Sequence, residues 1–236
     1  METIYQGKKV GAEYIVEDFV DRDYAENNGI RHFTAIIVPF ITDGKDKSKW
    51  IVHDRTPKLW AKKKPVRYEK SYNLIGGHIK ADDLSLKGKP MPYKTLLEGA
   101  LAELSEELFQ NDFAEPKAVD VEVWENGKNT GRVSQVGRYN HKELIPVGFT
   151  EYTAKNNVEY SCVFALPVPP EDYGNLVSAD DYGKNLNVKL NLEKFSEEQL
   201  KDMYENDPSV EVCDAINRLW LPENAETLDK LRLIIG

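Results

Sequence analysis

The sequence predicts an α+β fold built around a mixed β-sheet. Strand-like runs rich in β-branched and aromatic residues precede residue 80, a helical pattern covers 95–110, and further strand-like runs and then helical patterns follow. Strands and helices therefore occur in blocks, without a repeated strand–helix–strand unit. This order favours α+β over a parallel α/β architecture.

The first block of strands consists of a hairpin and a glycine-containing strand. "RHFTAIIVPFI" (31–41) and "KWIVHD" (49–54) are separated by the turn-rich "TDGKDKS", which is typical of a hairpin. "SYNLIGGHI" (71–79) is predicted as a third strand with a double glycine at its end. A Gly–Gly turn allows backbone carbonyls to approach a ligand closely.

Residues 95–110 are predicted to form an amphipathic helix, because leucines recur there at helical spacing. These leucines are Leu97, Leu101, Leu104 and Leu108.

The second block continues with strands and closes with helices. The predicted strands are 118–125, 143–152 and 158–168, and the last two flank "TAKNN" (153–157), a plausible hairpin loop. The predicted helices start at Ser196, at about 209 and at about 224, and 169–185 is predicted as a polar loop. We expect one domain over 1–236, with an N-terminal extension (1–30), a core (about 31–206) and C-terminal helices (about 207–236).

Composition excludes several classes of protein. The 236 residues carry a net charge of −9, which disfavours binding to a nucleic-acid polymer. Apolar runs such as "AIIVPFI" are too short to span a bilayer, and no signal peptide is recognisable, so we expect a cytoplasmic protein without membrane association. The two cysteines, Cys162 and Cys213, have no metal-ligand spacing and fit a reducing compartment. Cys162, in an apolar strand, is expected to be buried and inert.

The helix at 95–110 carries a cluster of carboxylates. Glu106 and Glu107 lie three and four positions after Glu103, so the three side chains share one side of the helix, opposite the leucines. No Lys or Arg lies between Lys94 and Lys117 to offset their repulsion. Oxygen ligands of this kind suit Mg²⁺, although many acidic helices are only solvated.

The stretch from the double glycine to these glutamates resembles the Nudix box, G-x5-E-x7-R-E-U-x-E-E-x-G-U, where U is a bulky aliphatic residue. Gly77 matches the opening glycine, and 103–107 match its E-U-x-E-E portion. The flanking strands and helix, over roughly 31–206, resemble the rest of that fold. The resemblance implies a mixed sheet sandwiched between helices, with a loop–helix–loop metal site.

The box is degenerate. Lys94 stands in place of its first glutamate, Ala102 in place of its arginine, and Phe109 and Gln110 in place of its last glycine and aliphatic residue. The spacing between Gly77 and Lys94 is also longer than in the family, so that 80–92 forms an insertion.

The resemblance implies a hydrolase of a nucleoside diphosphate linked to another moiety, such as a nucleotide-sugar or a dinucleotide. Glu103, Glu106 and Glu107 would hold Mg²⁺ or Mn²⁺, aided by the Gly77 carbonyl. The general base would be one of the box glutamates or a carboxylate from a later segment, for which Glu151 and Glu159 are the candidates. Homodimers are frequent in the family, and substrate choice would depend on 80–92 and 169–185.

Other interpretations stay open. The loss of two box residues is compatible with a non-catalytic Nudix-like domain that binds a nucleotide as a sensor or partner module. The helix could also be the solvated acidic face of an unrelated α+β protein. His78, directly after the glycines, is either a phosphate or metal contact or a plain turn residue, and the basic run 58–70, with Trp60 and Tyr68, is either an anion-binding segment or a solvated loop.

Overall fold

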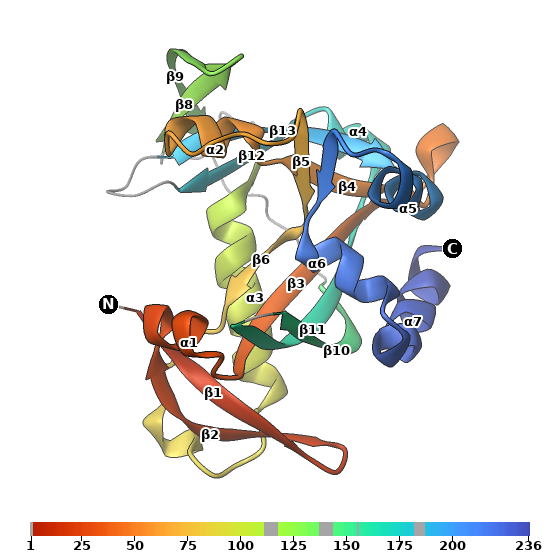
Figure 1. Ribbon diagram of the computed structural model, residues 1–236. Coiled ribbons are helices and arrows are strands. Elements are labelled where there is room, and N and C mark those ends of the chain that lie inside the picture. Colours follow the sequence, from red (N-terminus) through yellow and green to blue (C-terminus); the bar gives the residue numbers. More distant parts are fainter. Residues whose placement is uncertain (1, 111–117, 137–143, 155, 182–186) are drawn as a thin grey trace.

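The computed structural model describes residues 2–110, 118–136, 144–154, 156–181 and 187–236 (Figure 1). The strands in these ranges are β1 Thr3–Val10, β2 Glu13–Asp21, β3 His32–Ile41, β4 Trp50–Asp54, β5 Lys70–Asn73, β6 Ile75–His78, β7 Leu108–Gln110, β8 Ala118–Glu125, β9 Lys128–Val136, β10 Ile145–Ala154, β11 Asn157–Val168, β12 Leu176–Asp181, β13 Asn187–Phe195 and β14 Val210–Val212. The α-helices are α1 Arg22–Asn28, α2 Thr56–Ala61, α3 Tyr93–Glu107, α4 Pro170–Tyr173, α5 Glu197–Asn206, α6 Asp214–Asn217 and α7 Ala225–Ile235. Short 3-10 turns are η1 Gly44–Asp46, η2 Leu84–Leu86, η3 Arg218–Trp220 and η4 Pro222–Asn224.

The sheet is mixed, as predicted. Its main path runs β10-β11-β3-β4-β13-β12-β7. β11 lies parallel to β3 along the full length of β3, whereas β10 and β6 pair with their neighbours in the antiparallel direction. The predicted hairpin around 153–157 is confirmed by the β10–β11 pairing, although residues 143 and 155 lie outside the described ranges.

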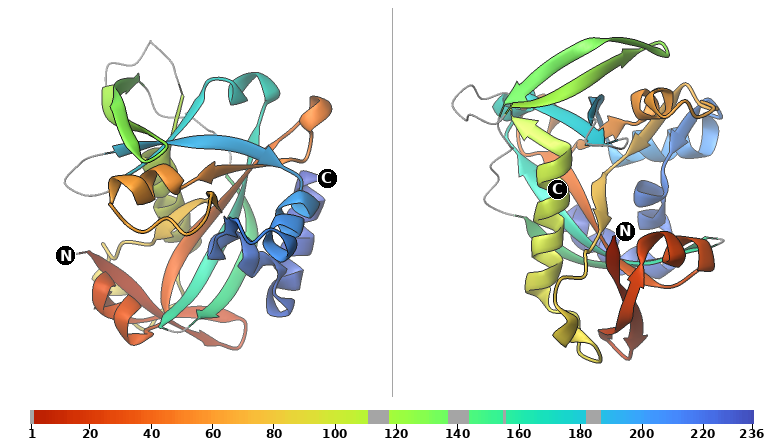
Figure 2. Two further views of the ribbon diagram at one scale, coloured as in Figure 1. Left: turned by 45° about the horizontal axis from the view of Figure 1, so that its top comes forward. Right: turned by 90° about the vertical axis from the view of Figure 1, so that its left-hand side faces the viewer.

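Alternate residues of β3 pack against helices on opposite faces of the sheet. Ala35 and Ile37 belong to a core cluster that includes the buried residues of α3, while Ile36 and Val38 belong to a second cluster with α5, α6 and α7. Because side chains alternate along a strand, one strand can fill both cores. The predicted sandwich of a mixed sheet between helices is therefore confirmed, and Figure 2 shows α3 and the C-terminal helices on its two sides.

Helix α3 forms where the leucine pattern predicts a helix, but it is shorter than predicted. Leu96, Ala100 and Leu104 face the first core and are buried. The helix ends at Glu107, because residues 108–110 leave it to form β7, which pairs with β12. This pairing partner lies far along the chain, so local spacing does not reveal the end of the helix.

Two predictions for the later part of the chain are wrong. The helix expected over 209–219 begins as strand β14, which pairs in parallel with β5 before α6 starts. The polar loop expected over 169–185 contains α4 and β12, and its residues 182–185 lie outside the described ranges. The helix predicted from Ser196 is confirmed as α5, with Ser196 and Gln199 forming a capping box.

The N-terminal extension is a structured part of the same sheet. Strands β1 and β2 form a hairpin that joins β3 through the Gln6–His32 pair. The predicted insertion is held against this hairpin by backbone hydrogen bonds, from the amides of Val16 and Met91 to the carbonyls of Lys89 and Tyr14. The extension and the insertion therefore support each other at the base of the molecule in Figure 1.

The first part of the basic run 58–70 belongs to a helix and not to a solvated loop. Residues 56–61 form helix α2, whose Thr56, Lys58 and Ala61 are buried.

Cys162 is buried as expected, and burial raises the pKa of its thiol to about 12. Among the described residues, no helix combines the length and apolar character needed to cross a bilayer.

Candidate functional site

Both glycines of β6 lie so close to neighbouring atoms that a larger residue would clash at either position. At Gly76, with φ +151°, a Cβ atom would lie 2.1 Å from the carbonyl oxygen of Ala35 in the neighbouring strand. At Gly77 a Cβ atom would lie 2.4 Å from Oε2 of Glu103. The first glycine therefore permits the strand pairing, and the second admits a carboxylate from α3.

Glu103 reaches the backbone of β6, and no cationic side chain in the described ranges contacts it. Its side chain is partly buried, and no described residue makes a hydrogen bond or an ion pair with its carboxylate. Loss of hydration, and secondarily the charge of Glu106, raise the pKa of Glu103 to about 7. An acidic group in this state is suited to a cation that the polypeptide itself does not supply.

Glu107 lies one turn further along α3 and faces the same strand. The backbone N–H of Gly76 donates a hydrogen bond to its Oε2 at 3.3 Å. Removal from water, followed by the charges of Asp180 and Glu103, raises the pKa of Glu107 well above its ordinary value. Two carboxylates of the predicted triad are thus brought together beside Gly76 and Gly77.

Glu106, the third member of the triad, points elsewhere. Its side chain is 56% exposed, and its Oε1 lies 3.2 Å from Nζ of Lys80. Within the described part of the chain, no group of three His, Cys, Asp or Glu side chains is arranged to hold a metal ion. The structure therefore brings together two of the three predicted metal-binding glutamates.

The donor set at Glu103 and Glu107 nevertheless fits a hard divalent cation. Mg²⁺ binds oxygen ligands and usually takes one or two protein carboxylates, with water and substrate oxygens completing its shell. The carboxylate of Glu103, which has no partner among the described residues, the neighbouring Glu107 and the close backbone of Gly77 provide oxygen donors of this type.

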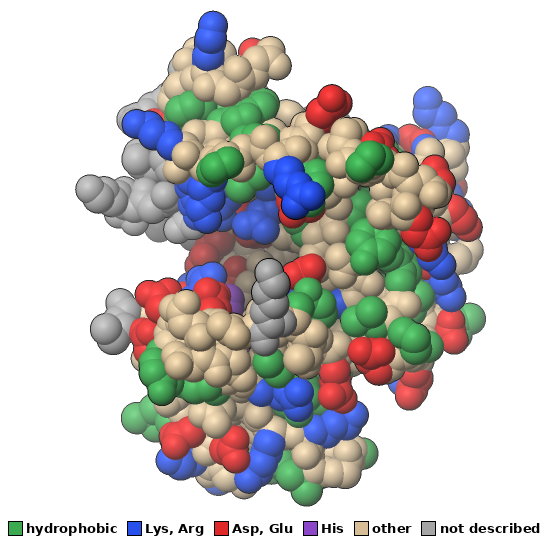
Figure 3. All heavy atoms as spheres, in the orientation of Figure 1, with side chains coloured by type: hydrophobic (Ala, Val, Ile, Leu, Met, Phe, Trp, Pro, Cys, Tyr) green, Lys and Arg blue, Asp and Glu red, His purple; other side chains and the backbone are tan. Residues whose placement is uncertain are grey.

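A cavity of about 460 Å³ adjoins the two glycines. Figure 3 shows the corresponding hollow, with Lys and Arg side chains on its upper rim and a His side chain on its lower side. The cavity therefore places a mixed, largely polar surface beside the carboxylates of α3. Its polar lining includes Arg22, Thr34, Arg55, Ser71, Asn73, His78, Asn157, Glu159, Glu211, Asp214 and Arg218.

Glu159 lies on this cavity in a fully partnered state. It is 8% exposed, and Nη1 of Arg218 donates to its Oε2 at 2.5 Å, while Asn157 donates to Oε1 at 2.7 Å. Burial alone would raise the pKa of Glu159, but Arg218 and Asn157 reverse this and hold the pKa at about 2. The group is thus an anion at neutral pH, bound to an arginine.

Glu151, the other carboxylate predicted as a general base, lies away from the cavity. It pairs across the β10–β11 ladder with Tyr160, the neighbour of Glu159, so Glu151 and Glu159 project from opposite faces of the sheet. Its Oε1 contacts Nζ of Lys9 at 2.6 Å. The structure brings only Glu159 of this predicted pair to the cavity.

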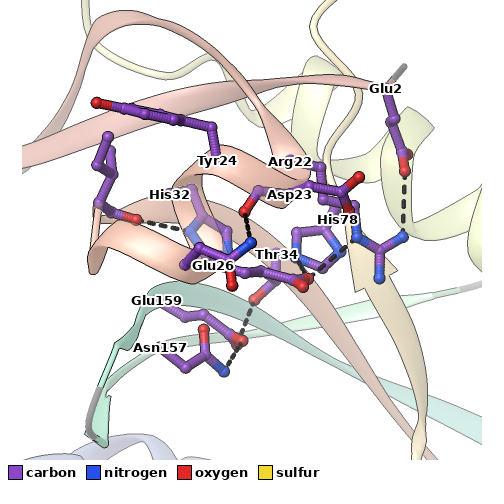
Figure 4. Close-up of polar contacts among 12 residues, drawn as sticks. Glu2, Arg22, Asp23, Tyr24, Glu26, His32, Thr34, His78, Asn157 and Glu159 are labelled. Carbon is purple, nitrogen blue, oxygen red and sulfur yellow. Dashed lines mark hydrogen bonds and ion pairs between the residues drawn. The ribbon is translucent and has the colours of Figure 1, made fainter.

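His78 lies in a polar cluster between the sheet and α1. Its Nε2 is 3.2 Å from Oε1 of Glu26, and its ring stacks on His32 with a centroid distance of 5.0 Å. Hydrogen bonding from His78 is the main cause that lowers the pKa of Glu26 to about 2, with Arg22 contributing. Figure 4 shows how α1 places Arg22 and Glu26 beside His78.

The sequence pattern missed the arginines of the cavity. Arg22 comes from α1, Arg55 follows β4, and Arg218 follows α6, so no motif joins them. The only available signal was their residue type, because their convergence depends on pairings between distant strands.

Comparisons with known proteins give matches among solved structures only. No protein-family model matches the sequence, and neither does any curated protein. Among solved structures, the crystal structure of Tm1382, described as a candidate Nudix hydrolase, matches with a TM-score of 0.47 and 14% sequence identity. That match covers 96% of this chain and 97% of the other.

Proposed function

We propose that this protein is a metal-dependent hydrolase of a nucleoside diphosphate linked to another moiety, such as a nucleotide-sugar or a dinucleotide. The observation that carries the proposal is the pair of carboxylates, Glu103 and Glu107, which meet at Gly76 and Gly77, while no cationic side chain among the described residues contacts Glu103. The adjoining cavity, with arginines in its lining, would receive the substrate.

Glu103 and Glu107 would hold Mg²⁺ or Mn²⁺, with the Gly77 carbonyl nearby. When bound, the cation would neutralise charge on the phosphoryl oxygens and favour attack of water on phosphorus. An arginine of the cavity would orient the diphosphate, since guanidinium groups bind phosphate oxygens in a bidentate manner.

Glu106 is the carboxylate that we assign to the general base. Glu159 is held as an anion by Arg218 with a pKa of about 2, which makes it a weak proton acceptor at neutral pH. Glu151 is directed away from the cavity. Glu106 is open to water, and it lies close enough to Glu103 for its charge to raise the Glu103 pKa.

The test is phosphate release, after coupling to a phosphatase, across nucleoside diphosphate sugars, dinucleotides and nucleoside triphosphates with Mg²⁺ or Mn²⁺. Glu107→Gln should lower kcat/KM by about 100-fold or more, because several kcal/mol of metal-derived stabilisation are lost. Glu98→Gln is the matched control, since Glu98 is exposed on the same helix and, among the described residues, pairs only with Lys94. Equal activity of parent and Glu107→Gln would contradict the metal assignment.

Glu106→Gln separates the two roles on α3. This variant should keep the thermal stabilisation given by Mn²⁺ but lose turnover, whereas Glu107→Gln should lose both. Loss of Mn²⁺ stabilisation in Glu106→Gln would instead make Glu106 a metal ligand.

A non-catalytic nucleotide-binding domain is the second candidate. It is favoured by the contact of Glu106 with Lys80, which leaves two carboxylates at the glycine turn, and by Ala102 and Lys94 in the helix. Nucleotide-dependent thermal stabilisation without turnover of any compound in the panel would support this candidate over the hydrolase.

A further inference from the structure

The three arginines of the cavity differ in how their charges are balanced. Arg218 is bound to Glu159, and Arg22 contacts both Glu2 and Glu26 at 3.1 Å. The side chain of Arg55 makes no hydrogen bond or ion pair with any residue in the part of the chain that the structure describes. Arg55 thus brings an uncompensated guanidinium to the cavity.

The acidic groups around Arg55 are already occupied. Asp54 accepts hydrogen bonds from the backbone N–H groups of Thr56 and Ser71, and its other oxygen lies 3.1 Å from Nζ of Lys70. Glu211 accepts from the Ser71 hydroxyl at 2.5 Å. Both carboxylates thus already have hydrogen-bond donors or a cation within the protein.

The backbone of Arg55 is fixed by a hydrogen bond, although its side chain has no hydrogen-bond or ion-pair partner within the described ranges. Its N–H donates to the carbonyl of Ser71 at 2.7 Å, and α2 begins at the next residue. The side chain is partly buried, and it extends from a backbone position that is held by this hydrogen bond at the start of α2. Little ordering would be needed when it binds a ligand.

The position of Arg55 lies between α3 and the segment that leads into α6. Burial raises the pKa of Glu107 and of Cys213, and the charge of Arg55 opposes that rise at both residues. Arg55 also lines the cavity together with Gly76 and Gly77. A group bound by Arg55 would therefore lie next to the carboxylates of α3.

We propose that Arg55 binds the phosphoryl oxygens of a diphosphate ligand in this cavity. The proposal rests on the proposed function and names the residue that would recognise its substrate. A guanidinium offers planar, paired donors that match phosphate oxygens, and this one lacks protein acceptors among the described residues. A diphosphate could reach from Arg55 toward Glu103 and Glu107, where the cation would offset its repulsion from the carboxylates.

The test measures binding without turnover. ADP and inorganic pyrophosphate, neither of which is linked to a second moiety, are titrated by calorimetry against the full chain with Mg²⁺ present, so that the cation can offset the charge of the carboxylates. Arg55→Gln should weaken ADP binding by about 10-fold or more, because charge-assisted hydrogen bonds are lost. Arg55→Lys should lie between the parent and Arg55→Gln, since it keeps the charge but loses the paired donors.

Arg67→Gln is the control, since Arg67 is exposed, does not line the cavity and carries the same charge change. Its affinity for ADP should match that of the parent. Equal affinity of Arg55→Gln and the parent, or no binding of either compound by the parent, would overturn the proposal. An equal loss of ADP affinity in Arg67→Gln would show that the loss in Arg55→Gln reflects a general effect of positive charge, and it would overturn the proposal as well.

This outcome is independent of the hydrolase proposal. If Arg55→Gln loses ADP affinity but the parent hydrolyses nothing with Mg²⁺ or Mn²⁺, the binding role stands and the enzymatic proposal fails. If Arg55→Gln binds ADP normally and Glu107→Gln is inactive, the hydrolase stands and the role of Arg55 is refuted.

Discussion

Two carboxylates near Gly77 have opposite electrostatic states. Glu103 reaches the glycine from α3 and has a pKa raised to about 7, whereas Glu159, on the cavity that Gly77 also lines, has a pKa lowered to about 2. Burial raises the pKa at both positions. The difference is Arg218, which contacts Glu159 at 2.5 Å, while no described cation contacts Glu103.

This contrast separates a structural carboxylate from one left open to a ligand. The Glu159–Arg218 pair is completed by Ser161 and Thr34, so its charges are already balanced within the protein. Glu103 and Glu107 repel each other and gain no comparable partner. Burial alone therefore does not identify a functional acid; the absence of an internal counter-charge does.

The largest effect on stability is expected when Arg218, the partner of Glu159, is removed. Arg218→Met should lower the free energy of unfolding by about 3–5 kcal/mol, because it leaves the buried Glu159 charge without its partner. Arg218 is 3% exposed, so water cannot replace the lost contact readily. Urea unfolding at pH 7 measures the effect.

The double variant Arg218→Met/Glu159→Gln is its control and should be more stable than Arg218→Met alone. A loss below about 1 kcal/mol in Arg218→Met would show that the pair is not the source of the low Glu159 pKa.

A smaller effect is expected from the pH dependence of the stability that Glu159 contributes. The folded-state pKa of Glu159 is about 2, against an ordinary value of 4.5, so its contribution to stability is present above about pH 4.5 and is lost as the pH falls toward 2. The full contribution is on the order of 3 kcal/mol. Unfolding free energies of the parent and Glu159→Gln, measured between pH 6 and pH 3, should converge as the pH falls. Parallel curves would refute the assignment.

The smallest effect is expected at Glu103, and it has the opposite sign. Glu103→Gln should stabilise the metal-free protein by about 1 kcal/mol at pH 8, because it removes a poorly hydrated charge next to Glu107. Thermal unfolding in a chelator checks this. The same variant should lose the stabilisation that Mn²⁺ gives the parent. A destabilised variant in the chelator would mean that Glu103 already has a favourable partner.

The elements that local patterns define could be predicted from the sequence. The leucine spacing gave α3, the capping residues gave α5, and the two runs around 153–157 gave the β10–β11 hairpin. These signals arise within a few residues of each other in the chain.

Elements that depend on distant partners could not be predicted. Local spacing predicts a helix over β14, because the strand character of this segment comes from pairing with β5, and Val210 lies 140 residues after its partner Lys70 (210 − 70). For the same reason α3 ends before Leu108, where pairing with β12 begins. Tertiary pairing overrode local propensity in both cases.

The candidate site shows the same division. The double glycine and the glutamates of α3 stood out because they follow one another at a recognisable spacing. The orientation of Glu106 toward Lys80, and the convergence of Arg22, Arg55 and Arg218, depend on contacts between separate segments. Those residues carry no shared pattern.

The cavity is lined by Arg22, near the start of the chain, and by Arg218, near its end, so it can form only late in synthesis. During synthesis the N-terminal hairpin and most strands leave the ribosome well before the segment that contains Arg218. Until then Glu159 has no counter-charge, and the strand face later covered by α6 and α7 is exposed to solvent. We therefore expect a nascent chain that stalls before residue 218 to depend on chaperones and to lack ligand-binding ability.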